Sequence, residues 1–259
     1  MSISEIILLF CAALLGGAVN SVAGGGGFIA FPALLFTGMP SINANATNTV
    51  ALWPGTLAST GAYRKALSSE LLKRILPLIV ITFFGSILGS ALLLKTRQST
   101  FDKMVPWLLL GATLLFSFSG KVTAWINRHH SEGGPSLWRI VGITVLQLCV
   151  AIYLGYFGAG VGIVMLALLS MMGLENIHSM NGLKTLLATC GNGVAVVMFI
   201  SAHAVRWPQA VLMVFGGGLG GYAGAWYAQK LDPRTVRSMV IAIGFSMTTF
   251  FFWRTYIRG

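Results

Sequence analysis

The sequence predicts an all-α integral membrane protein with about eight transmembrane segments in two homologous repeats, the first stretch of each repeat broken by a Gly-rich motif. Three observations carry this prediction. Hydrophobic residues make up 56% of the 259 residues and charged residues only 9%, whereas a soluble domain has about 25% charged residues. Most apolar stretches are long enough to cross a bilayer, which takes about 20 residues of helix. Glycine clusters interrupt two of these stretches, one in each half of the chain.

The apolar stretches follow one another along the chain and are separated by short segments with turn-forming and basic residues. Mean hydropathy is +0.81. A soluble protein of this size needs a polar surface, which so few charged side chains cannot supply. The stretches run roughly over residues 3–39, 42–63, 75–94, 104–120, 137–173, 177–203, 207–229 and 236–253.

The longest polar segment lies in the middle of the chain and divides it. We expect a first transmembrane repeat at 1–120, a polar central loop at 121–136 and a second transmembrane repeat at 137–259. The central loop and Arg64–Arg74 hold the larger share of the basic loop residues. The positive-inside rule therefore places both in the cytoplasm of a multi-pass protein of the cell (inner) membrane. It does not decide whether the repeats run parallel or inverted.

Two apolar stretches, 3–39 and 137–173, are too long for one straight crossing. At about 1.5 Å per residue each would reach almost twice through a hydrocarbon core of about 30 Å. The first contains Gly24–Gly27, and the second has glycine at positions 155, 158, 160 and 162. Each glycine in mid-helix costs about 1 kcal/mol relative to alanine, so we expect both helices to break there. Broken backbone survives in a membrane where protein or a water-filled cavity satisfies it.

The two halves resemble each other in the placement of glycine. Duplicated membrane units with interrupted helices in corresponding positions are typical of secondary transporters, in which substrate binds between the repeats. Gly85-x-x-x-Gly89 and Gly220-x-x-x-Gly224 have the spacing of close helix crossings, so we interpret them as helix contacts. A shift of 135 residues without a gap aligns Gly25 with Gly160, Gly27 with Gly162, Gly38 with Gly173, and Gly85 with Gly220.

Several classes of protein are excluded by composition and motifs. The net charge of +11 comes from basic residues between the apolar stretches, and no nucleic-acid motif or basic amphipathic face accompanies it, so no nucleic-acid partner is expected. Cys11, Cys149 and Cys190 lie inside apolar stretches without C-x-x-C spacing, which predicts neither a disulfide framework nor a metal site. We expect no catalytic residues, no cofactor and no cleaved signal peptide.

Both glycine clusters are candidate binding elements for an anion. A break in a helix leaves free N–H groups, and a helix N-terminus favours negative charge. We therefore interpret Asn20, Gly25 and Gly26 at the first break, and Gly160 and Gly162 at the second, as substrate-binding. The alternative is a close helix crossing, which needs only small residues.

A run of polar residues, Asn43–Thr49, enters the apolar stretch after the first break. Amides in lipid are costly without partners, so these side chains are expected to face the interior of the bundle. Asn45 and Asn48 are the candidates for substrate contact. The alternative is that amide and hydroxyl groups simply hold neighbouring helices together.

Lys184 is the one basic residue embedded in an apolar helix. It lies about 10 Å from the expected helix start, where an unpartnered charge costs several kcal/mol. Asn181, Thr185 and Asn192 share its helical face, so we interpret this face as substrate-binding. Two alternatives stay open, namely snorkelling of the lysine to the interface and a structural ion pair with Glu175.

The Gly-rich break, the Gly-x-Pro-x-x-x-Ala-x-Ala-Thr-Asn segment from Gly38 to Asn48, and a weaker repeat of both resemble the TauE/SafE family of membrane permeases. The first motif, at Gly24–Gly27 and Ala44–Asn48, is the more specific; the second lies at Gly158–Gly162 and Asn181–Thr185. The resemblance covers essentially the whole chain. It implies an anion permease of the sulfite exporter family that moves sulfite, organosulfonates or other small anions.

The function that these patterns favour is that of a secondary transporter exporting a small, sulfur-containing anion, with the lipid bilayer as its surroundings. The alternative is a non-transporting membrane protein, such as an assembly factor or a lipid-handling enzyme. We predict that the protein is not an enzyme, because no acid–base or nucleophile pair has convincing spacing. The sequence leaves open the substrate, the direction, proton or other ion coupling, and whether the protein is a homodimer.

Overall fold

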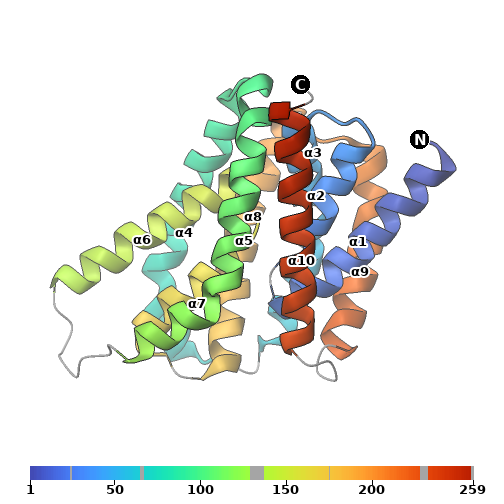
Figure 1. Ribbon diagram of the computed structural model, residues 1–259. Helices are drawn as coiled ribbons and strands as arrows, with labels where there is room; N and C mark the ends of the chain where they lie inside the picture. The colour runs from blue at the N-terminus through green and yellow to red at the C-terminus, as the bar shows by residue number, and fades with distance from the viewer. Residues whose placement is uncertain (24, 65–66, 129–136, 175, 228–232, 258–259) are drawn as a thin grey trace.

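All regular structure in the described chain is helical. The computed structural model describes residues 1–259 apart from 24, 65–66, 129–136, 175, 228–232 and 258–259, and this part contains no β-strand (Figure 1). The all-α fold class is thereby confirmed. The elements are α1 (Ile3–Ala23), α2 (Gly27–Phe36), α3 (Ser41–Ala62), α4 (Ser69–Lys95), α5 (Gln98–Arg128), α6 (Leu137–Tyr156), α7 (Val161–Met171), α8 (Ile177–Ser201), α9 (Trp207–Tyr227), α10 (Pro233–Phe252) and the π-helix η2 (Trp253–Ile257).

The helices have the length and surface of an integral membrane protein. Among the described residues, four helices are long and apolar enough to cross a bilayer, and two shorter apolar helices, Gly27–Phe36 and Ile140–Tyr156, accompany them. Large apolar side chains cover the outside, as Phe84, Phe215 and Tyr222 do with 58%, 65% and 82% exposure. Such a surface is stable in lipid and a liability in water. The four longer spans are Ile3–Asn20, Ser69–Lys95, His178–Ser201 and Ser238–Ile257.

The first glycine cluster forms the tip of a helical hairpin. The helix breaks where the sequence predicts, because α1 ends at Ala23 and α2 begins at Gly27. A Cβ atom on Gly26 would overlap the carbonyl oxygen of Gly16, and a Cβ on Gly16 would lie 3.5 Å from that of Ala30. α2 therefore runs back along α1, and glycine allows the two backbones to touch.

The second glycine cluster forms the tip of another helical hairpin, between α6 and α7. Gly158 and Gly160 have φ angles of +75° and +72°, a left-handed conformation that glycine adopts without steric cost. The Tyr153 hydroxyl donates a hydrogen bond to the carbonyl oxygen of Ala159 at 2.8 Å. The side chain of α6 thus holds the turn that reverses the chain.

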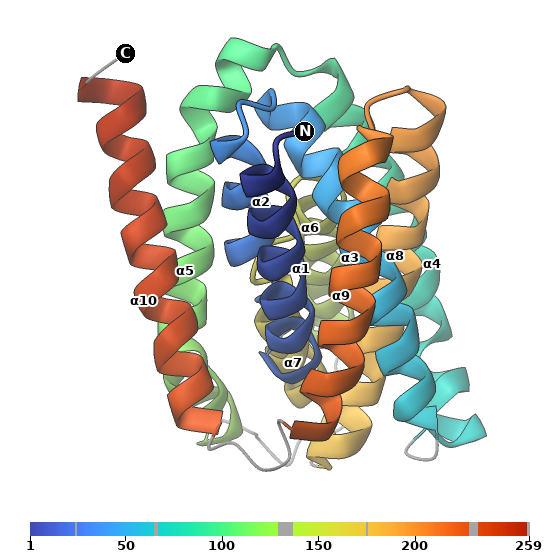
Figure 2. The same ribbon diagram turned by 90° about the vertical axis from the view of Figure 1, so that its right-hand side faces the viewer.

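The two halves pack in corresponding ways. α1 packs along α9 and α6 along α4, while α3 and α8 contact each other. α5 contacts α10, and the two lie side by side (Figure 2). A Cβ on Gly89 of α4 would overlap the carbonyl oxygen of Ile152, and a Cβ on Gly220 of α9 would overlap that of Leu14. These glycines are helix contacts, as the sequence predicts; the surroundings of Gly224 lie outside the described residues.

Corresponding helices of the two halves run in opposite directions. Both termini lie at one end of the molecule (Figure 1). At that end the Asn43 side chain of α3 donates to the carbonyl oxygen of Ala204, which follows α8, at 2.8 Å. At the other end Arg74 of α4 donates to the carbonyl oxygen of Met172, which follows α7, at 2.5 Å. α1, α3 and α5 begin at the end with the termini, whereas α6, α8 and α10 begin at the opposite end, so the directions are inverted.

α5 continues as far as Arg128, into the segment 121–136 where the sequence predicts the central loop. No glycine or proline interrupts the chain between residues 121 and 128, while Gly133-Gly134-Pro135 follows later. The helix therefore has no local reason to end earlier. Residues 129–136 lie outside the described part.

Candidate functional site

The tips of the two helical hairpins meet between α3 and α8. A Cβ on Gly27, in the first hairpin, would lie 3.8 Å from the Cβ of Ala159 in the second. It would also lie 3.6 Å from the Nδ2 atom of Asn48 on α3. The absence of a side chain at Gly27 therefore leaves room at the point where both breaks face a polar helix.

Two adjacent cavities occupy this region, each with a volume of about 60 Å³. They share four lining residues, Asn20, Thr56, Gly158 and Asn192. One buried water needs about 10–15 Å³ of cavity volume, so each cavity holds roughly four waters or one small ion. Each cavity has in addition its own characteristic residue, Asn48 in the first and Lys184 in the second.

Asn48 and Lys184 approach the cavities from opposite ends of the molecule. Asn48 is the eighth residue of α3 and Lys184 the eighth residue of α8. Each therefore lies about 10 Å from the start of its helix. Because α3 and α8 begin at opposite ends, the two side chains and the shared amides form a polar path through the interior of an apolar bundle.

Lys184 carries the positive charge of this path. Its side chain is 4% exposed, and its Nζ atom donates to the Oδ1 atom of Asn181, one turn earlier, at 3.1 Å. No acidic residue lines either cavity in the described part of the chain. Glu175, the alternative partner that the sequence left open, lies outside the described residues. The burial argues against snorkelling, because a snorkelling ammonium group would reach water.

The cavities offer hydrogen-bond donors that suit an anion. An ammonium group and side-chain amides are donors, whereas a hydroxyl has only one proton to give. The Thr185 hydroxyl donates within its own helix, to the carbonyl oxygens of Asn181 and Gly182 at 3.0 and 2.9 Å. Asn48 is 7% exposed. The donor that it offers is its Nδ2 group, which lies 3.6 Å from the position that a Cβ on Gly27 would take; its buried Oδ1 atom has no partner and, as an acceptor, is not satisfied by an anion.

Six of the eleven predicted site residues line these cavities, and five do not. The six are Asn20, Asn48, Gly162, Lys184, Thr185 and Asn192. Asn181 is next to the cavity through its bond to Lys184. Gly25 is buried, and Gly26 packs against Gly16. Gly160 packs against α5, because a Cβ added to it would lie 3.3 Å from the carbonyl oxygen of Ala112.

Asn45 has a partner that the sequence could not reveal. Its side chain is 1% exposed, and its Nδ2 atom donates to the carbonyl oxygen of Tyr156 at 3.0 Å. Tyr156 is the last residue of α6, and the last carbonyl groups of a helix lack intrahelical partners. Asn45 therefore holds the end of α6 at the opposite hairpin.

Sequence reasoning missed the part of the α3 face that lies deeper in the membrane. Trp53 and Thr56 line the cavities, and the Trp53 Nε1 atom donates to the carbonyl oxygen of Thr189 at 3.0 Å. The hydroxyls of Thr60 and Thr189 are 2.9 Å apart. Thr49, Trp53, Thr56 and Thr60 have i, i+4, i+7, i+11 spacing, which is the signal that a helical-face analysis would have detected.

Comparison with known proteins places the chain among membrane transporters. The family model described as sulfite exporter TauE/SafE matches residues 9–251. A "Probable membrane transporter protein" of Haemophilus influenzae is 28% identical over 249 residues, covering 96% of this chain and 94% of that protein. "Probable membrane transporter protein YfcA" of Escherichia coli K12 is 28% identical over 253 residues, covering 95% of this chain and 90% of that protein.

A third relative, "Probable membrane transporter protein ORF9" of a Sinorhizobium species, is 28% identical over 244 residues, covering 93% of this chain and 90% of that protein. No solved structure matches the chain. The matched residues 9–251 extend from α1 to α10 and include both hairpins and every cavity residue named above. The chain therefore belongs to the TauE/SafE family of membrane transporters.

Proposed function

We propose that this protein is a secondary transporter that exports a small, sulfur-containing anion, such as sulfite or an organosulfonate, from the cytoplasm across the inner membrane. The observation that carries the proposal is the buried Lys184 ammonium group beside a cavity with amide donors and no acidic lining residue among those described. The family description names sulfite, and an anion offsets the cost of a charge held inside the membrane.

The inverted directions of the two halves support a transport cycle. In many secondary transporters, inverted repeats rock against each other around a site near the bilayer midplane. Here the two hairpin tips and the polar path lie between α3 and α8, one from each half. We propose that residues 1–120 and 137–259 are the two moving repeats, separated by the polar segment 121–136 into which α5 extends, and that the small volume of both cavities corresponds to a closed state.

The orientation follows from the basic residues. Arg64, Lys73 and Arg74 lie at the end opposite the termini, next to the connection between α3 and α4. Basic loop residues favour the cytoplasmic side. We therefore place that end in the cytoplasm, where the start of α8 and Lys184 are the nearer part of the polar path for an anion arriving from inside the cell.

A ligand screen on the purified protein tests the proposal. Thermal stability is measured with sulfite, sulfoacetate, sulfate, acetate and the neutral dimethyl sulfone at matched ionic strength. We expect sulfite or sulfoacetate to raise the melting temperature and dimethyl sulfone to leave it unchanged, because binding to the folded state stabilises it. Flux of the stabilising anion is then measured in proteoliposomes. Stabilisation without flux would favour a non-transporting membrane protein. The absence of both stabilisation and flux would overturn the proposal.

A further inference from the structure

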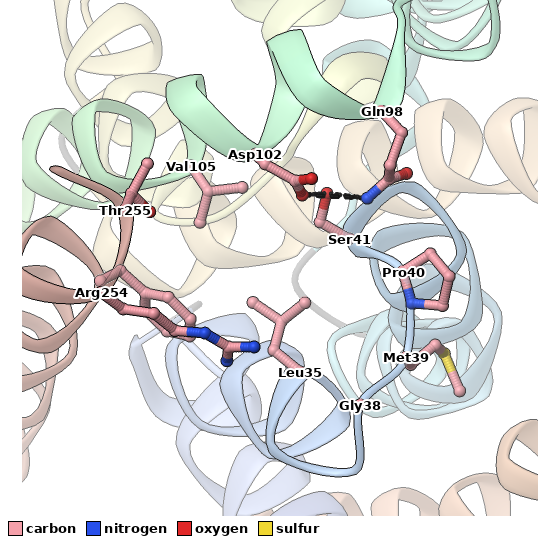
Figure 3. A pocket seen from close by; sticks show the side chains of 11 residues that line it. Leu35, Gly38, Met39, Pro40, Ser41, Gln98, Asp102, Val105, Arg254 and Thr255 are labelled. Atoms are coloured by element: carbon pink, nitrogen blue, oxygen red, sulfur yellow. Dashed lines mark hydrogen bonds between the residues drawn. The ribbon is translucent and has the colours of Figure 1, made fainter. Parts of the chain in front are cut away.

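A third and larger cavity lies at the end of the molecule that holds both termini. Its volume is about 460 Å³, within the range of about 300–1,000 Å³ that is typical of small-ligand sites. It lies between α2, the start of α3, the start of α5 and η2, and shares no lining residue with the two cavities described above (Figure 3). It therefore needs an explanation of its own.

One wall of this cavity presents an oriented carboxylate. The Ser41 hydroxyl donates to the Oδ1 atom of Asp102 at 2.5 Å, and the Gln98 Nε2 atom donates to the same oxygen at 2.9 Å (Figure 3). Ser41 is 3% exposed, so this arrangement is anchored in the protein interior. Both bonds use Oδ1, which leaves Oδ2 without a hydrogen bond in the described chain and available to a donor on a ligand.

The other wall presents a guanidinium group. Arg254 extends from η2 toward Leu35 of α2, across the cavity from Asp102 (Figure 3). The two charged groups form no ion pair in the described chain, although they line the same space. An arginine beside open space binds phosphate or sulfonate through two parallel N–H groups.

Aromatic side chains hold η2 in this place. The Trp107 Nε1 atom donates to the Tyr256 hydroxyl at 3.0 Å, and that hydroxyl donates to the carbonyl oxygen of Lys103 at 3.0 Å. Trp107, Trp253 and Tyr256 are 58%, 43% and 52% exposed. Exposed tryptophan and tyrosine at the ends of apolar helices mark the level of lipid headgroups. The cavity is therefore at headgroup depth, with exposed Phe36 beside it for contact with acyl chains.

We propose that this cavity binds the headgroup of phosphatidylethanolamine. The lipid comes from the leaflet on the side of the membrane where both termini of the chain lie. The lipid phosphate contacts the Arg254 guanidinium group, and the primary ammonium group donates to Oδ2 of Asp102. One cation and one carboxylate across a cavity complement a zwitterion with a short spacer. A choline headgroup has the positive charge but no N–H donor, and a glycerol headgroup has hydroxyl donors but no positive charge, so neither gives Asp102 the charge-assisted hydrogen bond of a primary ammonium group.

Lipid retention measured by native mass spectrometry tests this inference. Protein is released from nanodiscs with equal amounts of phosphatidylethanolamine and phosphatidylcholine, and bound lipids are counted. We expect wild type to retain mainly phosphatidylethanolamine, Arg254→Gln to retain about one tenth as much, and Arg254→Lys an intermediate amount. Asp102→Asn is expected to retain both lipids equally. Arg97→Gln, an exposed arginine near the same end that does not line the cavity, is the matched control.

Two results would overturn the inference. Equal retention of phosphatidylethanolamine by Arg254→Gln and Arg97→Gln would mean that the arginine does not bind the phosphate. Complete displacement of the lipid by millimolar glycerophosphoethanolamine would show that the cavity takes a soluble phosphodiester and not a membrane lipid. Inorganic phosphate in the same competition is expected to leave the lipid bound, because it reaches only one of the two charged groups.

Discussion

Lys184→Gln is the substitution that examines the candidate site most directly. Glutamine removes the positive charge and keeps an N–H donor near the Oδ1 atom of Asn181, which accepts the Lys184 hydrogen bond at 3.1 Å. The side chain is 4% exposed, and burying a charge in a membrane is costly. We therefore expect the variant without ligand to be at least as stable as wild type without ligand. We expect the variant to bind anions much more weakly than wild type.

The size of the effect follows from the contacts of the ammonium group. A hydrogen bond to a charged partner contributes about 1.5–3 kcal/mol, which corresponds to a loss of roughly 10- to 150-fold in affinity. Coulomb attraction between unit charges 4 Å apart at an effective dielectric constant of about 20 is about 4 kcal/mol. We take this as an upper bound, because an anion must also lose its hydration to enter a cavity of about 60 Å³.

The assay compares ligand-induced stabilisation of purified wild type and variant at equal ionic strength. A ligand at 100 times its Kd stabilises the folded protein by about 2.7 kcal/mol. If Lys184→Gln raises the Kd about 100-fold, the same ligand concentration stabilises the variant by only about 0.4 kcal/mol. Lys73→Gln is the matched control, because Lys73 is exposed and lines neither cavity.

Lys184→Arg separates charge from shape. Arginine keeps the charge but carries it on a planar, less strongly hydrated group, so we expect partial retention of binding. Affinity unchanged in Lys184→Gln would refute the reasoning, since the charge would then have only a structural role. Loss of binding together with a loss of stability in the absence of ligand would also count against it, because the variant was expected to fold at least as well.

Three further predictions follow from the same geometry. Gly27→Ala is expected to reduce anion binding several-fold because its Cβ would enter the space between Asn48 and Ala159, whereas Gly111→Ala, with nothing within 4 Å, should bind as wild type; equal affinities would contradict this. In a cysteine-free background, Thr100→Cys should react with an impermeant thiol reagent in intact cells and Lys73→Cys should not; the reverse pattern would invert the orientation. Asn45→Ala should lower stability by about 1 kcal/mol through loss of its bond to the end of α6, measured by denaturation without ligand; a loss of affinity with unchanged stability would return Asn45 to the binding site.

The breaks in the helices could be read from the sequence, but their shape could not. Four successive glycines have a local cost that predicts an interruption at α1–α2 regardless of tertiary structure. Whether the chain then continues across the membrane or turns back depends on contacts between segments. The turn requires Gly26 to pack on the backbone of Gly16, and nothing in the local sequence specifies that partner.

The candidate site was partly predictable for a similar reason. Lys184 stands out in sequence because it is a charge in an apolar helix, and the structure places it beside a cavity. Asn45 and Asn48 are harder to separate, because both are amides on the same helix. They differ by three residues, or about 300° of rotation, and only the packing of α3 decides that Asn48 faces the cavity while Asn45 faces α6.

A gapless comparison of the halves also conceals the correspondence that matters at the site. Gly38 and Gly173 align at the shift of 135 and both have positive φ, +77° and +80°. From there α3 begins three residues later, at Ser41, and α8 begins four residues later, at Ile177. The extra residue changes the shift to 136 within these helices, a change that the glycine pattern alone does not indicate.

In the register of the helices, Asn48 and Lys184 occupy the same position in α3 and α8, as do Asn45 and Asn181. The two halves therefore present the same helix position to the polar path from opposite ends, one with a neutral amide and one with a charge. In the cycle proposed above, rocking of the inverted halves would change which end of the path is open and would leave the charge on α8. An anion would then meet a fixed cation on one wall and neutral amide donors on the other. Such an arrangement attracts the anion, and because only one wall is charged, the anion can also leave.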